Sequence, residues 1–378
     1  MENGYLRYYK ERQISPVNQD ITDIDVHYGR RRKLYRQCGI PVIAFRDAEV
    51  LEVGPGGGYN TLAFFHWGAR HVDLVEANPK GIEDMRKLFG SQNIPLNKYE
   101  IFPCKIEAYR TEKRYDIIIA EGFLSNVPNQ QEIIEKLKGL LAVDGIIVVT
   151  CIDNVSCFIE SMKRLIGKVL VKDIPLYQDK LSFLSEVFGK QLAMLKGVSR
   201  PAEDWVQDNI LNPVVNDNFE LSMLQAICLF GEGYDVLGSS PQMFVDYSWY
   251  KDIWHAYKED YKRQFREKHM SLLLANMPEQ IIAGEKTERL EAHFKCIRSL
   301  ASEFDMSLES NYIDKILEHM DEMEEDLQDI DVSFLDVFAN IRDALYQVKN
   351  TGEVEMEEYP DFFESFGRSQ QYIAFMKK

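Results

Sequence analysis

Several features that would assign a chain to a broad class are missing from this sequence of 378 residues. It has no apolar run of the roughly 18 residues that would suggest a membrane span. The first residues, Met1 to Gly4, have neither the basic nor the apolar region of a signal peptide. Its six cysteines include no C-x-x-C pair, which favours buried thiols over a disulfide or zinc framework. We therefore expect a cytoplasmic protein with no membrane partner.

Basic residues are also scarce. Lysine and arginine number 44 against 61 aspartates and glutamates, which gives a net charge of -17. Because a nucleic-acid binder needs a basic surface to displace counterions, we expect no nucleic-acid partner. Acidic residues are densest between 301 and 360, where a charged helical face and a docking site for a cationic partner both fit the pattern.

The most informative stretch runs from Val50 to Asn60. An apolar run enters a turn rich in glycine, and an amphipathic run leaves it, which predicts a strand, a tight loop and a helix. The G-x-G-x-x-G pattern of dinucleotide enzymes does not fit, because Tyr59 stands where its third glycine would be. The pattern that does fit is an acidic residue followed by G-x-G-x-G: Glu52, Gly54, Gly56 and Gly58.

A second short apolar run, His71 to Val75, ends in the acidic residue Glu76. A carboxylate at this place in a nucleotide-binding βαβ unit accepts hydrogen bonds from ribose hydroxyls. The ordered pair of motifs resembles the class I S-adenosylmethionine-dependent methyltransferases. The resemblance implies S-adenosylmethionine (SAM) as cofactor, bound by Glu52, Gly54, Gly56, Gly58, Glu76 and Ala77. A glycine-rich turn without a ligand is the alternative.

The chain departs from the family pattern after its third expected strand, near Tyr99 to Phe102. The family usually has an acid there that contacts adenine, but Lys105 stands in its place. The resemblance therefore moves the adenine contact to Glu107 or to backbone groups. Glu121, directly after the fourth expected strand, is also expected beside the donor.

Two further apolar runs, Tyr115 to Ala120 and Gly145 to Thr150, are separated by a helical pattern. Continuous apolar strands separated by helices indicate a parallel sheet covered on both faces. With the resemblance, we predict an α/β, doubly wound, mostly parallel seven-stranded Rossmann-like sheet. Helical periodicity elsewhere predicts a large helical insertion and a helical C-terminal region.

These patterns suggest five parts. They are a lid at 1–47, a SAM-binding core at 48–155, a helical insertion at 156–219, the remainder of the core at 220–249, and a helical region at 250–378. The seventh strand comes from 242–249 or from 370–376, and the sequence leaves both open. Helical stripes in the last region either wall the acceptor pocket or form a homo-oligomer interface.

The lid segment carries several residues that suit a binding site. By the resemblance, Tyr28, Arg32 or Tyr35 would touch the methionine end of the donor or the acceptor. His27 is the candidate general base. The basic run from Arg30 to Lys33 would meet a phosphate on the acceptor, or would simply form a solvated helix face.

Acidic residues also follow two of the expected strands. Glu121 follows the fourth strand, and Asp153 and Asn154 follow the fifth, at the sheet edge where such folds react. This arrangement resembles the magnesium ligands of catechol-type O-methyltransferases, where the ion lowers the pKa of an acceptor hydroxyl. The alternative is that Asp153 or Asn154 caps the next helix.

We therefore predict a SAM-dependent methyltransferase that acts on a hydroxyl of a small-molecule acceptor, such as a sugar or nucleotide sugar. The tetrapeptide typical of amino methyltransferases that act on bases or glutamine, Asn-Pro-Pro-Tyr or Asp-Pro-Pro-Tyr, is missing after the fourth strand. Two alternatives remain. One is an N-methyltransferase or aminopropyltransferase with a cationic acceptor, and the other is a SAM-binding module without activity.

Overall fold

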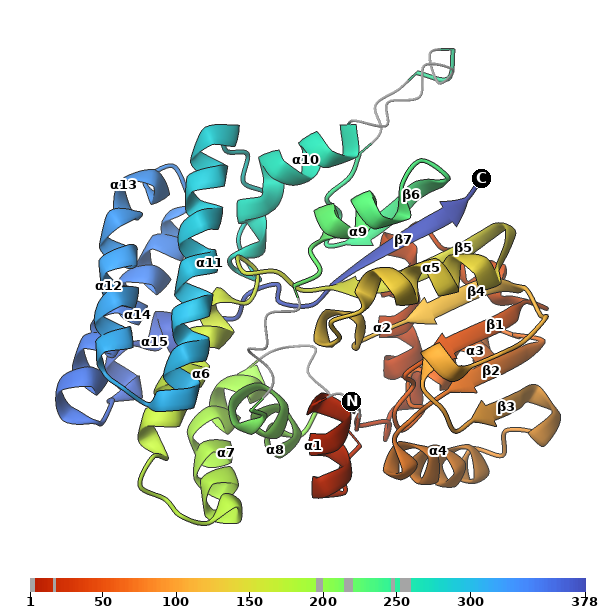
Figure 1. Cartoon of the computed structure of the whole chain (residues 1–378), viewed down its shortest axis with the longest axis horizontal. Helices are drawn as coiled ribbons and strands as arrows, with labels where there is room; N and C mark the ends of the chain where they lie inside the picture. The colour runs from red at the N-terminus through yellow and green to blue at the C-terminus, as the bar shows by residue number, and fades with distance from the viewer. Residues whose placement is uncertain (1–3, 16–17, 195–199, 214–219, 246–248, 252–259) are drawn as a thin grey trace. The chain divides into compact units, whose positions relative to one another are not determined.

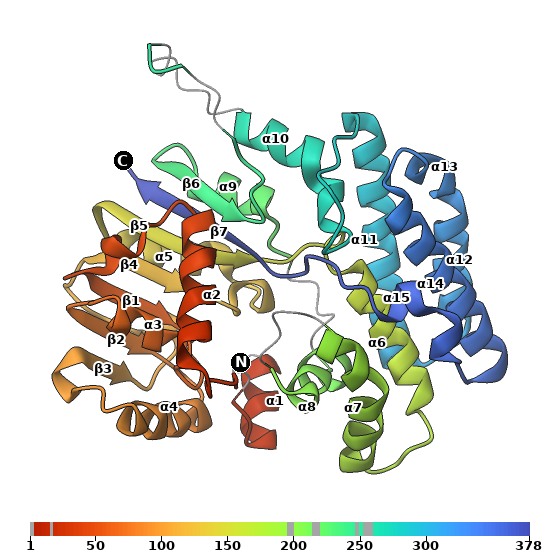
Figure 2. The same ribbon diagram turned by 180° about the vertical axis from the view of Figure 1, so that it is seen from behind.

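The computed structural model describes residues 4–15, 18–194, 200–213, 220–245, 249–251 and 260–378. The chain forms two compact units, each made of segments far apart in the sequence (Figures 1 and 2). We call the first the sheet unit (Met1–Cys151, Phe219–Lys262 and Gln371–Lys378) and the second the helical unit (Ile152–Asn218 and Arg263–Gln370). No helix in the described ranges is long and apolar enough to cross a bilayer.

A seven-stranded sheet in the order β3-β2-β1-β4-β5-β7-β6 forms the centre of the sheet unit. Only β7 runs antiparallel to its neighbours, so the mostly parallel sheet predicted from the sequence is confirmed. The strands are β1 (Glu49–Val53), β2 (His71–Val75), β3 (Tyr99–Phe102), β4 (Tyr115–Ala120), β5 (Leu141–Cys151), β6 (Tyr234–Ser240) and β7 (Gln371–Lys377).

Helices cover both faces of this sheet. In both views α2 lies on one face, and α5 and α9 lie on the other (Figures 1 and 2). The helices of the sheet unit are α1 (Gly4–Arg12), α2 (Ile24–Gln37), α3 (Thr61–His66), α4 (Pro79–Ser91), α5 (Gln130–Leu140) and α9 (Met223–Phe230). Short 3-10 helices occupy Val42–Phe45, Leu96–Lys98, Ile106–Ala108 and Leu124–Asn126.

Strand register brings the predicted donor residues to one edge of the sheet. Val53 at the end of β1 pairs with Val75 of β2 and with Ala120 of β4. The residues that follow these three strands, Gly54, Glu76 and Glu121, therefore begin at the same level, at the carboxyl ends of parallel strands. Open α/β sheets bind their ligands at this edge.

The structure also settles two details at the other end of the sheet. Gln371–Lys377 forms the seventh strand, between β5 and β6. The competing segment 242–249 lies partly outside the described residues. Strand β5 starts at Leu141 instead of Gly145, because Leu141 already pairs with Tyr115 of β4. The register then shifts before Ile146 pairs with Ile117, and Asp144 in this irregular stretch has a φ of 58°.

The helical unit consists of packed amphipathic helices. Its helices are α6 (Phe158–Leu170), α7 (Tyr177–Met194), α8 (Ala202–Val206), a π-helical turn (Gln207–Leu211), α11 (Gly284–Ser307), α12 (Asn311–Glu322), α13 (Glu324–Leu327), α14 (Val332–Thr351) and α15 (Pro360–Phe363). Most of α10 (Asp260–Lys268) also belongs to it, followed by the 3-10 helix His269–Leu272, with another at Met356–Glu358.

The apolar stripes expected in this region are buried. Leu290, Phe294 and Ile297 of α11 face inward, as do Ile313 and Ile316 of α12. Within the helical region expected at 250–378, residues 273–283 are not helical. Pro278 lies in this stretch and has no backbone N–H to continue a helix.

Candidate active site

The glycine loop between β1 and α3 has the backbone that the sequence predicted. Gly54, Gly56 and Gly58 have φ values of 72°, 56° and 78°. Residues other than glycine rarely adopt this backbone conformation. A Cβ on Gly58 would lie 2.7 Å from Cγ of Met85 in α4. The loop therefore packs directly against α4 and has no room for larger residues.

Glu76 joins the end of β2 to this loop. Its Oε2 accepts a hydrogen bond from the Gly56 N–H at 2.8 Å, and its Oε1 accepts one from the Asn78 N–H at 2.7 Å. Burial raises the pKa of Glu76, although these backbone bonds and one from Ala77 oppose the rise. The carboxylate is held against the loop, where the resemblance places the ribose hydroxyls.

Glu52, the acid that opens the glycine motif, lies inside the sheet unit. It is 2% exposed and accepts a hydrogen bond from Thr61 Oγ1 at 2.6 Å. Burial raises its pKa to about 8. Its contact with Thr61, the first residue of α3, ties the start of the loop to its end.

Glu121 is the centre of a buried polar cluster that we call the Glu121 cluster: Arg31, Tyr35, Asn60, Glu121 and Tyr372. Arg31 donates to both carboxylate oxygens, at 2.9 and 2.6 Å, and also to the Tyr35 hydroxyl. Asn60 Nδ2 donates at 3.1 Å, and the Tyr372 hydroxyl donates as well. Burial opposes ionisation, but Arg31 outweighs it and lowers the pKa of Glu121.

The arginine of this cluster is Arg31, which the sequence analysis did not single out as a site residue. The contact of Arg32 with the donor or the acceptor stays a prediction. His27, Arg31 and Tyr35 are spaced by four residues on the buried face of α2, whereas Arg32 is exposed. Tyr28 stacks on His66 with ring centroids 4.0 Å apart. Helical spacing from His27 was the signal that would have selected Arg31.

His27, the candidate base, contacts the glycine loop. Its Nε2 lies 3.0 Å from the carbonyl oxygen of Tyr59, and the ring is buried. Burial lowers the pKa of His27, and the nearby Arg31 charge lowers it further. The imidazole is therefore neutral near pH 7.

The segment before α2, part of the lid expected at 1–47, also lies against the loop, although the sequence analysis singled out none of its residues. Asn78 Nδ2 donates to the Ile14 carbonyl at 3.0 Å, and Gln19 Nε2 donates to Asn60 Oδ1 at 3.1 Å. Ser15 is buried, and its hydroxyl has no hydrogen-bond partner within the described ranges. That hydroxyl is 3.5 Å from where a Cβ on Gly57 would lie. An unpaired buried hydroxyl beside the loop fits a site that receives a polar ligand.

Glu107 is exposed and belongs to the 3-10 helix that follows β3. Its Oε1 accepts a hydrogen bond from Asn129 Nδ2 at 3.2 Å. Its contact with adenine stays a prediction.

Asp153 belongs to the helical unit and already has a cationic partner there. Its Oδ2 lies 3.0 Å from His269 Nε2, and its Oδ1 accepts from the Ser156 N–H at 2.8 Å. Burial opposes both charges, but the pair outweighs it: the pKa of Asp153 is lowered and that of His269 is raised to about 10. Helix α6 begins after Cys157 without a side-chain cap, so Asp153 caps the turn before the helix and not the helix itself.

These contacts bear on the predicted magnesium site at Glu121, Asp153 and Asn154. Arg31 occupies both oxygens of Glu121, and His269 and Ser156 occupy those of Asp153. A magnesium ion would need these oxygen lone pairs for itself. The residues as placed do not fit the ion, and no catalytic step below uses it.

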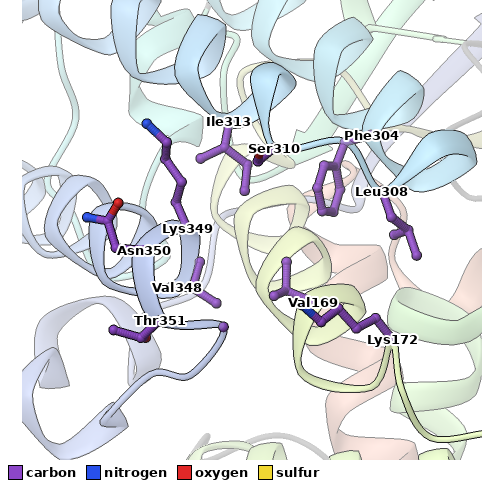
Figure 3. A pocket seen from close by; sticks show the side chains of 11 residues that line it. Val169, Lys172, Phe304, Leu308, Ser310, Ile313, Val348, Lys349, Asn350 and Thr351 are labelled. Carbon is purple, nitrogen blue, oxygen red and sulfur yellow. The ribbon is translucent and has the colours of Figure 1, made fainter.

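A cavity of about 250 Å³ lies elsewhere, inside the helical unit (Figure 3). Its walls come from α6, α11, α12 and α14, and none of the predicted site residues lines it. Apolar side chains such as Phe304 and Ile313 face two lysines, Lys172 and Lys349.

Residues 29–187 match a family model described as a methyltransferase domain. The matched range contains Arg31, the glycine loop, Glu76 and Glu121. A search of curated proteins finds no match.

Three solved structures illustrate the proteins that part of the chain resembles. TehB from Haemophilus influenzae is 21% identical over 28% of this chain and 36% of its own, with a TM-score of 0.26. The N-methyltransferase NodS from Bradyrhizobium japonicum WM9, solved with S-adenosyl-L-homocysteine, is 17% identical over 41% and 76%, with a TM-score of 0.33. The glycopeptide N-methyltransferase MtfA, solved with SAM, is 17% identical over 28% and 47%, with a TM-score of 0.25. The chain thus spans less than half the length of TehB and MtfA.

The family match covers the same stretch that carries the glycine motif, the acidic residue after β2 and the cluster after β4. The glycine backbone and the buried carboxylate at the sheet edge fit a SAM donor site. Residues 29–187 therefore resemble a methyltransferase domain, and they contain most of the parallel strands of the Rossmann-like sheet.

Proposed function

We propose that this protein transfers the methyl group of SAM to a hydroxyl of a small polar acceptor, such as a sugar or nucleotide sugar. The observation that supports this proposal is the environment of His27 beside the glycine loop. A hydroxyl must lose its proton when it becomes an ether, so a positioned base accelerates the reaction. An amine that attacks as a free base has less need of one.

His27 has the properties of such a base. Its lowered pKa keeps the ring neutral near pH 7. In the neutral ring, an Nε2–H that donates to the Tyr59 carbonyl leaves the lone pair on Nδ1. In the proposed reaction the acceptor oxygen bonds to the methyl carbon as the carbon–sulfur bond breaks, and Nδ1 takes the hydroxyl proton. The Glu121 carboxylate favours the imidazolium that results.

The donor in this proposal supplies an electrophilic methyl group on a sulfonium. Glu76 would accept hydrogen bonds from the ribose hydroxyls, and Gly54, Gly56, Gly58 and Ala77 would let the donor approach the backbone. Glu52 would fix the loop from within, and Glu107 would face the adenine. Ser15 and the Glu121 cluster would hold the methionine end or the acceptor.

One observation favours a second function. The net charge of -17 would attract a cationic acceptor, as an N-methyltransferase or aminopropyltransferase requires. The two functions differ in their need for a base, and His27 variants separate them.

The first test measures donor binding. Titration calorimetry with SAM and with S-adenosylhomocysteine should show micromolar binding that Glu76→Ala abolishes. Glu83→Ala is the matched control, because it removes an exposed carboxylate from the neighbouring helix α4. Unchanged affinity in Glu76→Ala would refute the proposed ribose contact.

The second test measures turnover on panels of hydroxylated and amine acceptors. With a hydroxyl acceptor, His27→Gln should lower kcat by about 10²- to 10⁴-fold and leave SAM affinity intact. Turnover of the wild type should persist in EDTA. A His27→Gln variant with full activity on an amine would favour the second function instead.

A further inference from the structure

Three side chains of the helical unit lie together, far in sequence from the donor motif. They are His293 of α11 and His319 and Glu322 of α12, which we call the His–His–Glu cluster. The two Nδ1 atoms are 3.1 Å apart. Glu322 Oε2 lies 3.8 Å from Nδ1 of His293 and 3.6 Å from Nδ1 of His319.

These three distances suit a bound metal ion. A point equidistant from the three atoms lies about 2.0 Å from each, which matches Zn–N and Zn–O bond lengths. Two imidazoles and one carboxylate are also a common ligand set for zinc. No ligand atom has to move far to bind the ion.

The local charges favour a cation. Two neutral Nδ1 atoms at this distance repel each other unless a proton or a cation lies between them. His319 and Glu322 are in the last turn of α12, where the helix carries partial negative charge. Two arginines of the helical unit already have acidic partners: Arg289 of α11 pairs with Asp326, and Arg342 of α14 pairs with Asp321 and Glu324.

The cluster lies on two helices that pack against each other, and its side chains are accessible to solvent. Helices α11 and α12 are joined by only three residues and are packed through buried stripes that include Phe294 and Met320, each next to a histidine of the cluster. Side chains on such packed helices hold a ligand geometry better than side chains on loops. Both histidines are partly exposed, so an ion has a path to the site.

A second group of potential ligands, His71, Asp73 and Glu100 in the sheet unit, does not offer the same chemistry. Asp73 is bound by the Lys113 ammonium at 2.9 Å and by the Tyr115 hydroxyl. A metal ion there would have to displace a cation that is already paired. Among the described residues, the hydrogen bonds and ion pairs of the His–His–Glu cluster involve no such competing cation.

We propose that His293, His319 and Glu322 bind one Zn²⁺ ion, with water in the fourth position, and that the ion clamps α11 to α12. This site belongs to the helical unit, whereas the residues proposed for methyl transfer belong to the sheet unit, and it does not depend on the proposed acceptor. Its role is to stabilise the helical unit.

The test uses the full chain without an affinity tag, stripped of metal by EDTA and dialysed. Titration with Zn²⁺ should show one ion per chain, and Co²⁺ should give the strong visible absorption of a four-coordinate ion. His293→Ala and His319→Ala should weaken zinc binding by more than the roughly 10- to 100-fold that loss of an outer-sphere partner costs. Zinc at 100 times its Kd should raise the Tm of the wild type by about 5 °C and leave these variants unchanged.

Two control variants remove a carboxylate or an imidazole that lies outside the His–His–Glu cluster. Glu318→Gln removes an exposed carboxylate from α12, and His71→Ala disrupts the other group of potential ligands. Both should bind zinc like the wild type. If the wild type binds no zinc, or if the double variant His293→Ala/His319→Ala binds it as tightly as the wild type, the proposal is wrong. Loss of binding in His71→Ala alone would also overturn it.

Discussion

At the scale of residues, Arg31 and Glu121 form an ion pair that is almost completely buried. The two side chains are 7% and 12% exposed, and two hydrogen bonds join them. Removing two charges from water has a large cost in free energy, which the pair offsets only when both partners are present. The pair therefore acts less as a source of stability than as a constraint that fixes α2 beside the end of β4.

Removing one partner tests this constraint. Glu121→Gln leaves the Arg31 charge buried without its counter-ion, so it should lower the free energy of unfolding by about 3–5 kcal/mol in urea denaturation. The double variant Arg31→Met/Glu121→Gln should lose less than the sum of the two single variants. Additive losses would show that the two charges do not depend on each other.

Gly58 is a second residue whose side chain is restricted by its surroundings. A Cβ there would require a φ of 78° and would meet Met85 at 2.7 Å and Phe89 at 2.9 Å. Gly58→Ala should therefore lower the free energy of unfolding by about 1–3 kcal/mol and weaken S-adenosylhomocysteine binding, as measured by calorimetry. Gly139→Ala is the control: this glycine lies in α5 with no atom within 4 Å of the added Cβ. Equal effects of the two substitutions would contradict the steric argument.

Among secondary-structure elements, one buried histidine joins three segments of the helical unit. His269 starts a 3-10 helix, Asp153 lies in the turn before α6, and Glu291 belongs to α11. His269 contacts both carboxylates through its two ring nitrogens. The charged imidazolium therefore connects these three segments through its contacts with the two carboxylates.

This contact predicts how stability depends on pH. The pKa of His269 is raised to about 10 in the folded state, so its contribution is complete below its ordinary value of about 6.5. The contribution is lost as the pH rises from about 6.5 to about 10, at no more than about 1.4 kcal/mol per pH unit. The lowered pKa of Asp153 gives the opposite dependence in acid, with stability lost as the pH falls below about 3.9.

Thermal unfolding at pH 6, 8 and 9.5 measures this dependence. The wild type should lose stability across the series, and His269→Gln should be less stable at pH 6 and should lose less stability than the wild type between pH 6 and 9.5. A wild type with a constant Tm between pH 6 and 9.5 would show that His269 is not charged in the folded protein.

At the scale of the whole molecule, both units are built from segments far apart in the sequence. The last strand, β7, lies between β5 and β6 and is the only hydrogen-bonded neighbour of β6. Within the described sheet, the C-terminal residues therefore connect β6 to the parallel strands. Such long-range pairing forms slowly because its loop entropy must be overcome first.

Deleting residues 371–378 should prevent the sheet unit from folding. Strand β6 would lose its partner, and β5 would expose an edge with unpaired backbone groups. We expect loss of the near-ultraviolet circular dichroism of the native state and loss of S-adenosylhomocysteine binding. Tyr372→Phe is the matched control, because it keeps the strand and removes only the hydroxyl that contacts Glu121. A deletion variant that still binds the ligand would refute this role of β7.

The sequence predicted those parts of the fold that depend on local patterns. The strands β1, β2 and β4 are rich in β-branched and other apolar residues, and the positive φ values of Gly54, Gly56 and Gly58 follow from their residue type. Once the strands are parallel and in register, Glu76 must emerge beside the loop. These features needed no information from distant residues.

Tertiary structure decided the rest. The sequence could not choose between 242–249 and 370–376 for the last strand, because both have strand-like patterns and only pairing with β5 separates them. It did not identify Arg31 as the partner of Glu121, because the two residues belong to different elements and meet only in the folded chain. Two further groups bring together residues from different elements: the pair Asp153 and His269, and the cluster of His293, His319 and Glu322. Local sequence patterns do not show which distant residues meet in the fold. Local residue types set the strands and the donor loop, whereas contacts between distant segments set which charged groups meet.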